Sequence, residues 1–436
     1  MRGTMKLEFQ RNTILRLVAV VTIAGALTVS CRRKTRPAEP PKPAEPPKPV
    51  QQALVRGGPF PTLILAQAWF WKDEKGAPKP GWARLLIWRQ TDSGWKATRL
   101  EDAESNVFHK PILMKDGSIL TIGAERALLK RWRYAGDKWT SETIWSREWG
   151  GKFNRLRDIE IGDVDGDGKD EYVIATHDQG VVAVVNPPEG GQPAQVIELG
   201  RQPDTFVHEI EIGDIDGDGR LEFFATPSAR NKAGVSQQGE VAMYRYDPAK
   251  KEYVHTVVDP MGKTHAKEIL VADADGDGRP DLLSAVEAQL EEGHIVHPVE
   301  IRRYLLQKDG SFTHEVVATI DDSQCRFLIP GDFDGDGKTE IVAAPIKKGL
   351  FLIKAEKKAG KTRWTVHHFE ESSSGYEHAG LAADLDGDGK DELYVAADDQ
   401  RSLDRYVFGA DGVSVKTRIG SLEPATITWN LAAGKL

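Results

Sequence analysis

A nine-residue acidic segment recurs five times in the second part of the chain. Its first copy, residues 163–171, reads DVDGDGKDE, with carboxylates at positions 1, 3, 5 and 9 and glycine at positions 4 and 6. Aspartates at alternate positions can turn their oxygen atoms toward one hard cation, and Ca²⁺ suits an oxygen cage of this kind. The five copies therefore predict up to five calcium sites.

We name the copies by their first residues, as the Asp163, Asp214, Asp273, Asp332 and Asp384 loops. Position 7 is Lys or Arg in all five, which suits a ligand that offers its backbone carbonyl while its side chain turns to solvent. A metal-free acidic turn is the competing interpretation, and a carboxylate at position 9 in every copy argues against it. The predicted ligand sets are Asp163, Asp165, Asp167, Lys169 and Glu171; Asp214, Asp216, Asp218, Arg220 and Glu222; Asp273, Asp275, Asp277, Arg279 and Asp281; Asp332, Asp334, Asp336, Lys338 and Glu340; and Asp384, Asp386, Asp388, Lys390 and Glu392.

Other calcium motifs fit these loops poorly. An EF-hand needs Glu at position 12, where the first loop has Ile174, and helices on both sides, whereas here strand-like runs flank each loop. What remains resembles the FG-GAP or VCBS-type calcium repeats of integrin head propellers and of many exported bacterial proteins. The resemblance covers residues 157–400 directly and residues 55–156 only by strand count. The blades with acidic loops do not repeat the family's Phe-Gly and Gly-Ala-Pro signatures, so integrin-like ligand chemistry is not carried over.

The spacing of the loops predicts the fold. First aspartates are separated by 51, 59, 59 and 52 residues, and a period of about 50 residues with four strands is typical of a propeller blade. Residues 105–145 offer four more strands and residues 61–101 only three, while residues 425–431 form a strand without a blade. We therefore predict an all-β, seven-bladed β-propeller over residues 55–436, with five calcium-loop blades from about 157 to 424. Its ring closes by pairing of the C-terminal strand into the first blade.

The first thirty residues predict export. A basic start precedes an apolar run of about 13 residues, Leu17 to Val29, which suits a signal sequence and is shorter than a membrane span. The TVSC segment that ends at Cys31 resembles the lipobox of bacterial lipoproteins, so residues 1–30 are interpreted as a lipoprotein signal peptide and Cys31 as the lipidation site. An ordinary secretory signal or an uncleaved anchor are the alternatives. Since Arg32 follows the cysteine, the resemblance implies an envelope protein anchored in the outer membrane.

A proline-rich stretch separates the signal from the propeller. In residues 31–54 the motif PAEPPKP occurs twice in tandem, a composition that favours polyproline II and cannot pack a core. At ~3.1 Å per residue the nineteen residues from Arg32 to Val50 would span on the order of 60 Å. We interpret it as a tether that lifts the propeller off a membrane; the alternative is a ligand for a proline-reading domain.

The face opposite the calcium loops is the predicted ligand-binding surface. Seven of the eleven histidines fall in the connections assigned to it, together with several arginines. The competing interpretation is that loops collect polar residues and that these histidines hydrogen-bond to neighbouring blades. A transition-metal pair at His294 and His297 lacks a third ligand. The candidates are Phe108, His109, Asn154, Arg155, His177, His208, Arg230, His265, Lys267, His294, His297, Arg326, Tyr376, His378 and Arg401.

Composition and the absence of known catalytic motifs argue against several classes of function. The net charge is −8, and positions 1, 3, 5 and 9 of the five loops account for 20 of the 66 acidic residues, so nothing favours a nucleic-acid partner. No nucleophile elbow, phosphate loop or zinc motif occurs. The leading hypothesis is a calcium-stabilised, membrane-anchored surface propeller that binds a protein or polysaccharide ligand without catalysis. The alternatives are a polysaccharide lyase that uses Arg and His of the opposite face, and a structural spacer.

Overall fold

The computed structural model describes residues 47–150, 154–230, 235–358, 361–409, 412 and 414–436. The interpretations of residues 1–30, Cys31 and most of the tether fall outside these residues and stay predictions. Across the described ranges the chain forms strands and turns only. None of these residues belongs to a helix long and apolar enough to cross a membrane.

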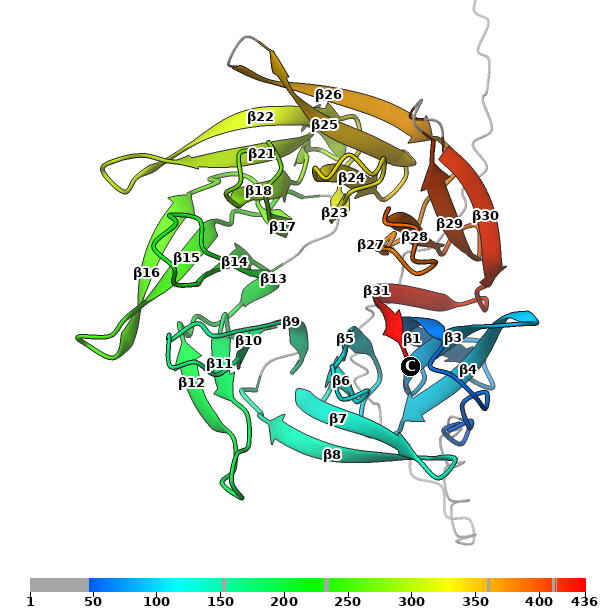
Figure 1. Ribbon diagram of the computed structural model, residues 1–436. Helices are drawn as coiled ribbons and strands as arrows, with labels where there is room; N and C mark the ends of the chain where they lie inside the picture. The colour runs from blue at the N-terminus through cyan, green and yellow to red at the C-terminus, as the bar shows by residue number, and fades with distance from the viewer. Residues whose placement is uncertain (1–46, 151–153, 231–234, 359–360, 410–411, 413) are drawn as a thin grey trace, which may run out of the picture. The chain divides into compact units, whose positions relative to one another are not determined.

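Six four-stranded antiparallel sheets and one five-stranded sheet surround a common axis, and this confirms the predicted propeller (Figure 1). From the axis outward, the first three blades are β31 (Thr426–Lys435), β1 (Pro61–Lys72), β3 (Ala83–Thr91) and β4 (Gly94–Asp102); β5 (Phe108–Leu113), β6 (Ile119–Gly123), β7 (Leu128–Ala135) and β8 (Lys138–Ser146); and β9 (Leu156–Gly162), β10 (Glu171–Thr176), β11 (Val182–Asn186) and β12 (Gln195–Leu199). The other four are β13 (Thr205–Gly213), β14 (Glu222–Ala229), β15 (Val241–Asp247) and β16 (Glu252–Asp259); β17 (Ala266–Ala272), β18 (Asp281–Val286), β21 (Val299–Leu306) and β22 (Phe312–Ile320); β23 (Cys325–Gly331), β24 (Glu340–Pro345), β25 (Leu350–Lys358) and β26 (Lys361–Glu370); and β27 (Gly380–Ala383), β28 (Glu392–Ala397), β29 (Ser402–Phe408) and β30 (Ser414–Ser421).

The C-terminal strand closes the ring as predicted. β31 pairs with β1 in antiparallel register from Pro61 opposite Lys435 to Trp69 opposite Thr426. It is the innermost strand of the first blade, so that blade joins the two ends of the propeller. Pairing the ends in this way leaves neither of them as an open sheet edge.

The hydrophobic core is divided among the spaces between blades. Each pair of neighbouring blades encloses its own cluster of buried apolar side chains. Phe223 and Phe224 show how one strand serves two clusters, because consecutive side chains of a strand point to opposite faces. Phe223 packs toward the third blade and Phe224 toward the fifth, and both are fully buried. Inner strands covered on both faces therefore carry continuous apolar runs rather than a strict alternation.

Polar contacts also join the inner strands of neighbouring blades. The Asp158 carboxylate accepts a 2.9 Å bond from the Ile210 amide, and Glu268 accepts one of the same length from the Leu328 amide. These bonds fix the inner strands around the axis, because each carboxylate satisfies a backbone group of the next blade.

The calcium loops all connect an innermost strand to the second strand of its blade, so they share one face of the ring. We call it the metal face. The starts of the innermost strands and the ends of the second strands consequently share the opposite face. Two elements that the sequence did not predict extend this opposite face. They are β2 (Pro78–Pro80), paired with the end of β1, and the hairpin of β19 (Gln289–Glu291) and β20 (His294–His297) between β18 and β21.

Candidate functional site

Each calcium loop is held by hydrogen bonds to its first carboxylate. In the Asp163 loop the amides of Gly166 and Gly168 donate to the two oxygens of Asp163, at 2.8 and 2.9 Å. The same two glycines have φ angles of 78° and 90°, a left-handed region where a side chain would be strained. The first aspartate therefore orders the loop, and glycine at positions 4 and 6 allows it to close.

The loops bring their predicted ligands together. In each one, at least three carboxylates offer oxygens within 4.8 Å of one another. The converging groups are Asp163, Asp165 and Glu171; Asp214, Asp216 and Asp218; Asp273, Asp275 and Asp281; Asp332, Asp334 and Asp336; and Asp384, Asp386, Asp388 and Glu392.

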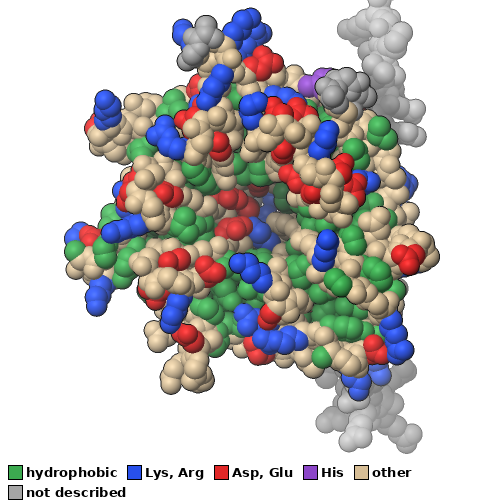
Figure 2. Space-filling model, viewed as in Figure 1, with side chains coloured by type: hydrophobic (Ala, Val, Ile, Leu, Met, Phe, Trp, Pro, Cys, Tyr) green, Lys and Arg blue, Asp and Glu red, His purple; other side chains and the backbone are tan. Residues whose placement is uncertain are grey.

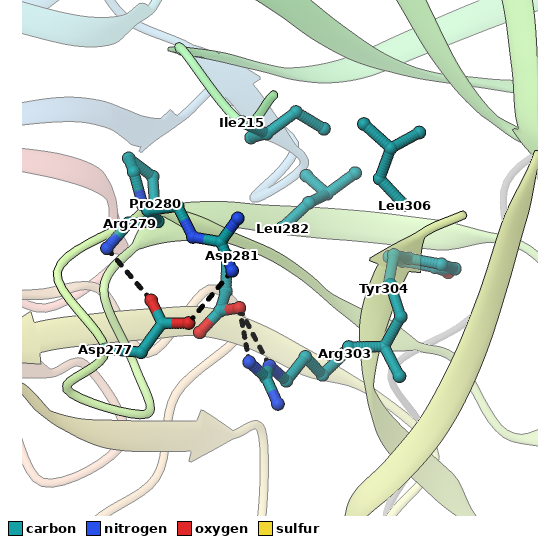
Figure 3. A pocket seen from close by; sticks show the side chains of 10 residues that line it. Ile215, Asp277, Arg279, Pro280, Asp281, Leu282, Arg303, Tyr304 and Leu306 are labelled. Carbon is teal, nitrogen blue, oxygen red and sulfur yellow. Dashed lines mark hydrogen bonds and ion pairs between the residues drawn. The ribbon is translucent and has the colours of Figure 1, made fainter. Parts of the chain in front are cut away.

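The Asp273 loop tests whether these residues fit a divalent cation. Asp275 Oδ1 and Asp281 Oδ2 are buried and have no hydrogen-bond partner, although the other oxygen of each side chain lies 2.7 Å from the Arg303 guanidinium. Figure 3 shows Arg303 reaching Asp281 from one side while Arg279 folds over Asp277 from the other. Burial raises the pKa of Asp281. Lys357 Nζ lies 3.9 Å from Asp275 Oδ1, beyond hydrogen-bond distance. A cation held by the two oxygens would satisfy them, so the donor set fits Ca²⁺.

The position-9 carboxylate lies beneath its loop. Glu171 is fully buried, and its Oε2 accepts the Val164 amide at 3.0 Å. Burial, with the nearby Asp165 charge, raises the pKa of Glu171 to about 7. Among the described residues no ion pair reaches the four carboxylates of the Asp163 loop.

A second candidate site is a cavity on the opposite face, which we call the Trp429 pocket. It measures about 570 Å³ and lies where β1 and β6 end and where β31 and β9 begin. The Trp429 indole forms one wall, and the Tyr376 ring, 62% exposed, stands edge-on to it at 6.2 Å. Its lining includes Phe70, Asn106, Glu125, Asn154, Arg155 and Trp429.

Cationic side chains gather beside this pocket. The Arg157 guanidinium carbon lies 5.1 Å from the centre of the Trp429 ring. Arg157 is also 3.5 Å from Glu377, which accepts a 3.0 Å bond from Arg326. Burial, next to the Arg157 charge, lowers the pKa of Arg155 to about 10, so Arg155 stays charged at neutral pH. Two arginines therefore share one glutamate, and Arg155 adds a further positive charge to the pocket.

Five of the histidines predicted for the ligand-binding surface lie inside the protein. His109, His177, His208, His265 and His378 are all buried. Burial is the main cause that lowers the pKa of each one, to about 3 for His265 and about 4 for His378. These five histidines are neutral near pH 7, and the positive charge of this face comes from arginine and lysine.

Two of the histidines do tie blades together, as the competing interpretation expects. His109 Nδ1 lies 2.7 Å from the Leu156 carbonyl oxygen, and His378 Nδ1 lies 2.6 Å from that of Pro345. His177 differs, because neither of its ring nitrogens has a hydrogen-bond partner. Its ring stacks on Phe206 at 4.2 Å.

The other predicted residues divide into groups. Arg155 and Asn154 line the pocket, whereas His294 and His297 lie on the exposed β19–β20 hairpin. Sequence reasoning missed Trp429, Arg157 and Glu377. Trp429 was assigned only to the closing strand. Arg157 lies in β9, and the residue pattern of this strand does not tell which of its side chains face the central axis and which face the neighbouring blades.

The axial channel holds charged groups that the sequence did not single out. Figure 2 shows acidic and basic side chains inside the central hollow of the ring. Lys110 lies 2.9 Å from Asp158. Burial would lower the pKa of Lys110, but the charges of Asp158 and Glu160 keep it well above its ordinary value. Burial raises the pKa values of Glu209 and Glu211, and that of Glu268 to about 8.

Comparison with known proteins identifies the repeats. The chain carries FG-GAP-like repeats, because the family described as FG-GAP-like repeat matches residues 163–225 and 273–343. The two matched segments contain the first four calcium loops, which confirms the resemblance inferred from their spacing. The Asp384 loop lies outside the matched segments.

One curated relative is an enzyme. Over 285 residues the chain is 25% identical to the rhamnogalacturonan exolyase YesX of Bacillus subtilis (strain 168). The similarity covers 55% of this chain and 45% of that protein, so the chain matches less than half the length of its relative.

Solved structures share the fold at low identity. A Lactobacillus plantarum protein superposes with a TM-score of 0.56 at 10% identity, over 86% of this chain and 99% of its own. A candidate 6-phosphogluconolactonase from Bacteroides uniformis gives a TM-score of 0.52 at 10% identity, over 86% of this chain and 100% of its own. At this identity the similarity concerns the fold alone.

Proposed function

We propose that the protein is an interaction module that binds an acidic polysaccharide in the Trp429 pocket. The observation that carries this proposal is that Trp429 and Arg155 line one cavity, while Tyr376 and Arg157 lie against the Trp429 ring beside it. Trp429 and Tyr376 offer ring surface, while Arg155 and Arg157 offer positive charge. Pockets that combine apolar walls with a few convergent polar groups are the usual ligand sites of proteins.

The chemistry of a uronate suits this pocket. A sugar ring presents a face of C–H groups that packs on an indole, and its carboxylate accepts the paired N–H donors of a guanidinium. Arg155 retains its charge at neutral pH because its pKa, although lowered by burial, stays at about 10. A neutral sugar would use the aromatic wall but offer no carboxylate to the guanidinium, so we expect the pocket to prefer acidic chains.

The relative supports a polysaccharide rather than a protein ligand. By its name YesX acts on rhamnogalacturonan, and the similarity covers 55% of this chain. Because the similarity is distant and partial, it suggests the class of ligand and not the activity.

A lyase is the second candidate, and His177 is the observation in its favour. Its two ring nitrogens have no partner, and burial beside the Arg155 charge keeps it neutral, which is the form a general base requires. The base would take the proton from the carbon next to the uronate carboxylate. The freed electron pair would form a carbon–carbon double bond, and the glycosidic oxygen would leave and receive a proton. The same lowered pKa makes His177 a weak base, so we rank binding first.

Calcium has a structural role in this proposal. One loop lies at the same place in each of five blades, which suits local braces more than one active centre. The bare oxygens of Asp275 and Asp281 support an ion there. Each ion would tie an innermost strand to the second strand of its blade on the metal face.

Export and lipid anchoring complete the proposal. The signal-like residues 1–30, Cys31 and the proline-rich tether support a propeller displayed from the bacterial outer membrane. A tether on the order of 60 Å would let the opposite face reach long polymers.

Incubation with acidic polysaccharides separates the two candidate functions. The full chain is mixed with rhamnogalacturonan and polygalacturonate, and both retention on the immobilised polymer and ultraviolet absorbance of unsaturated ends are followed. Retention without new absorbance is the expected result. Steady growth of unsaturated ends, lost in His177→Ala, would replace the binding proposal by the lyase. Neither retention nor product would refute both.

A further inference from the structure

The residue of the third strand that faces position 9 differs among the calcium loops. β10 and β11 pair at Tyr172 and Val185, which places Asn186 next to Glu171. By the same register, Arg245 faces Glu222 in the fourth blade and Lys354 faces Glu340 in the sixth. Three equivalent positions therefore carry one neutral amide and two cations.

These side chains make different contacts. Asn186 donates to Glu171 Oε1 at 3.0 Å. Arg245 donates to Glu222 Oε1 at 2.9 Å and also contacts the position-3 carboxylate, Asp216. Lys354 repeats this arrangement, 3.5 Å from Glu340 and 2.7 Å from Asp334. The two cations bridge positions 3 and 9, which are two of the predicted ligands of Ca²⁺ in their loops.

The position of the glutamate follows the identity of this residue. Opposite Asn186, Glu171 belongs to the group whose oxygens converge within 4.8 Å. Opposite Arg245 and Lys354, the converging groups consist of three aspartates, and Glu222 and Glu340 are not among them. A tethered cation thus draws the glutamate away from the position of the ion, whereas the amide leaves it there.

The other two loops use an arginine placed two residues earlier on the third strand. Arg303 pairs with Leu283 and Arg405 with Tyr394, so each reaches position 9 diagonally. Their position-9 residues, Asp281 and Glu392, remain in the converging groups. The Asp273 and Asp384 loops keep their position-9 carboxylate in the converging group and also hold an arginine against it. We therefore rank their affinity for a divalent cation between that of the Asp163 loop and that of the Asp214 and Asp332 loops.

We propose that the third-strand side chain in contact with position 9 grades the five loops, so that the Asp163 loop is the strongest divalent cation site. In the Asp214 and Asp332 loops, Arg245 and Lys354 take over part of the role of the ion and keep those loops folded without it. This inference rests on the calcium proposal. Its physical basis is that affinity for Ca²⁺ increases with the number of carboxylates that face the ion without an internal counter-charge.

Exchange of these residues tests the grading. The full chain is compared with Asn186→Arg, Arg245→Asn and Lys354→Asn by calorimetric titration with calcium, and by melting in chelator. Arg245→Lys retains the charge and is the matched control. The wild type should show one site at least tenfold tighter than the rest. Asn186→Arg should weaken that site at least tenfold without lowering the melting temperature in chelator.

The two neutral replacements should act in the opposite direction. Arg245→Asn and Lys354→Asn should each add a tight site and lower the melting temperature in chelator, while Arg245→Lys should behave as the wild type. An unchanged tight site in Asn186→Arg, or no gain in both asparagine variants, would overturn the grading and leave the calcium proposal intact. A wild type that takes up no calcium and melts identically in chelator would refute the calcium proposal, and the grading with it.

Discussion

The Arg157 guanidinium lies 5.1 Å from the Trp429 ring, although Arg157 belongs to the third blade and Trp429 to the last strand of the chain. Trp429 reaches this place because β31 is the innermost strand of the first blade. One strand therefore both closes the ring and supplies the aromatic wall of the proposed site. Stability and the proposed ligand binding would consequently share this strand, and single substitutions can separate them.

Leu431 carries the stabilising part of this strand. It is 6% exposed and packs in the cluster between the seventh and first blades. We expect Leu431→Ala to lower the free energy of unfolding by about 2–5 kcal/mol, measured by urea denaturation. Val415→Ala, on an outer strand and 65% exposed, is the control and should change stability by less than about 0.5 kcal/mol. Equal effects of the two substitutions would mean that β31 does not stabilise the closure.

Removal of calcium should destabilise the propeller. If an ion binds only the folded chain, calcium at 100 times its Kd contributes about 2.7 kcal/mol for each site. We therefore expect chelator to lower the melting temperature and added calcium to restore it, as followed by calorimetry. An identical melt with and without chelator would contradict structural metal.

The buried channel carboxylates predict a pH dependence. Burial raises the pKa of Glu268 to about 8, above the value near 4.5 of the unfolded chain. The folded state then binds the extra proton between these pH values, so this group contributes stability below pH 4.5 that is lost as pH rises toward 8. Glu268→Gln should show a shallower decline of unfolding free energy over this range, measured at constant calcium. A decline as steep as in the wild type would exclude Glu268 as its source.

Lipid attachment can be followed directly. Cys31→Ala should abolish incorporation of labelled fatty acid when the full chain is expressed in a bacterium with lipoprotein processing. Cys325→Ala is the matched control, since Cys325 is fully buried in the propeller and should leave labelling unchanged. Label that persists in Cys31→Ala would refute the predicted lipobox.

The propeller could be predicted from the sequence because the features that define each blade are short motifs that recur along the chain. The loops mark one turn per blade, and the count of strands between them defines the sheets. Ring closure was predictable because residues 61–101 offer only three strands for a four-stranded blade and residues 425–431 form one strand with no blade of their own. The β19–β20 hairpin escaped prediction because an insertion on one blade leaves the period unchanged.

The candidate ligand site was less predictable because it joins residues from several blades. Trp429 and Arg157 meet only after the chain ends pair, and neither has a local signal. The histidines were assigned to connections, whereas His109 and His208 lie within β5 and β13. Their burial depends on neighbouring blades, and burial decides whether they are charged. The proposed grading of the acidic loops has no local sequence signal either, because Asn186 and Glu171 become neighbours only through strand pairing.

The most direct test of the account measures binding of the full chain to a rhamnogalacturonan and to the same polymer with its carboxylates reduced. Trp429→Ala tests the aromatic wall, and Val415→Ala is the control. The account predicts binding to the acidic polymer that weakens with added salt, falls at least tenfold on carboxylate reduction, and falls at least tenfold in Trp429→Ala at unchanged stability. Equal binding of the two polymers, or undiminished binding in Trp429→Ala, would contradict it.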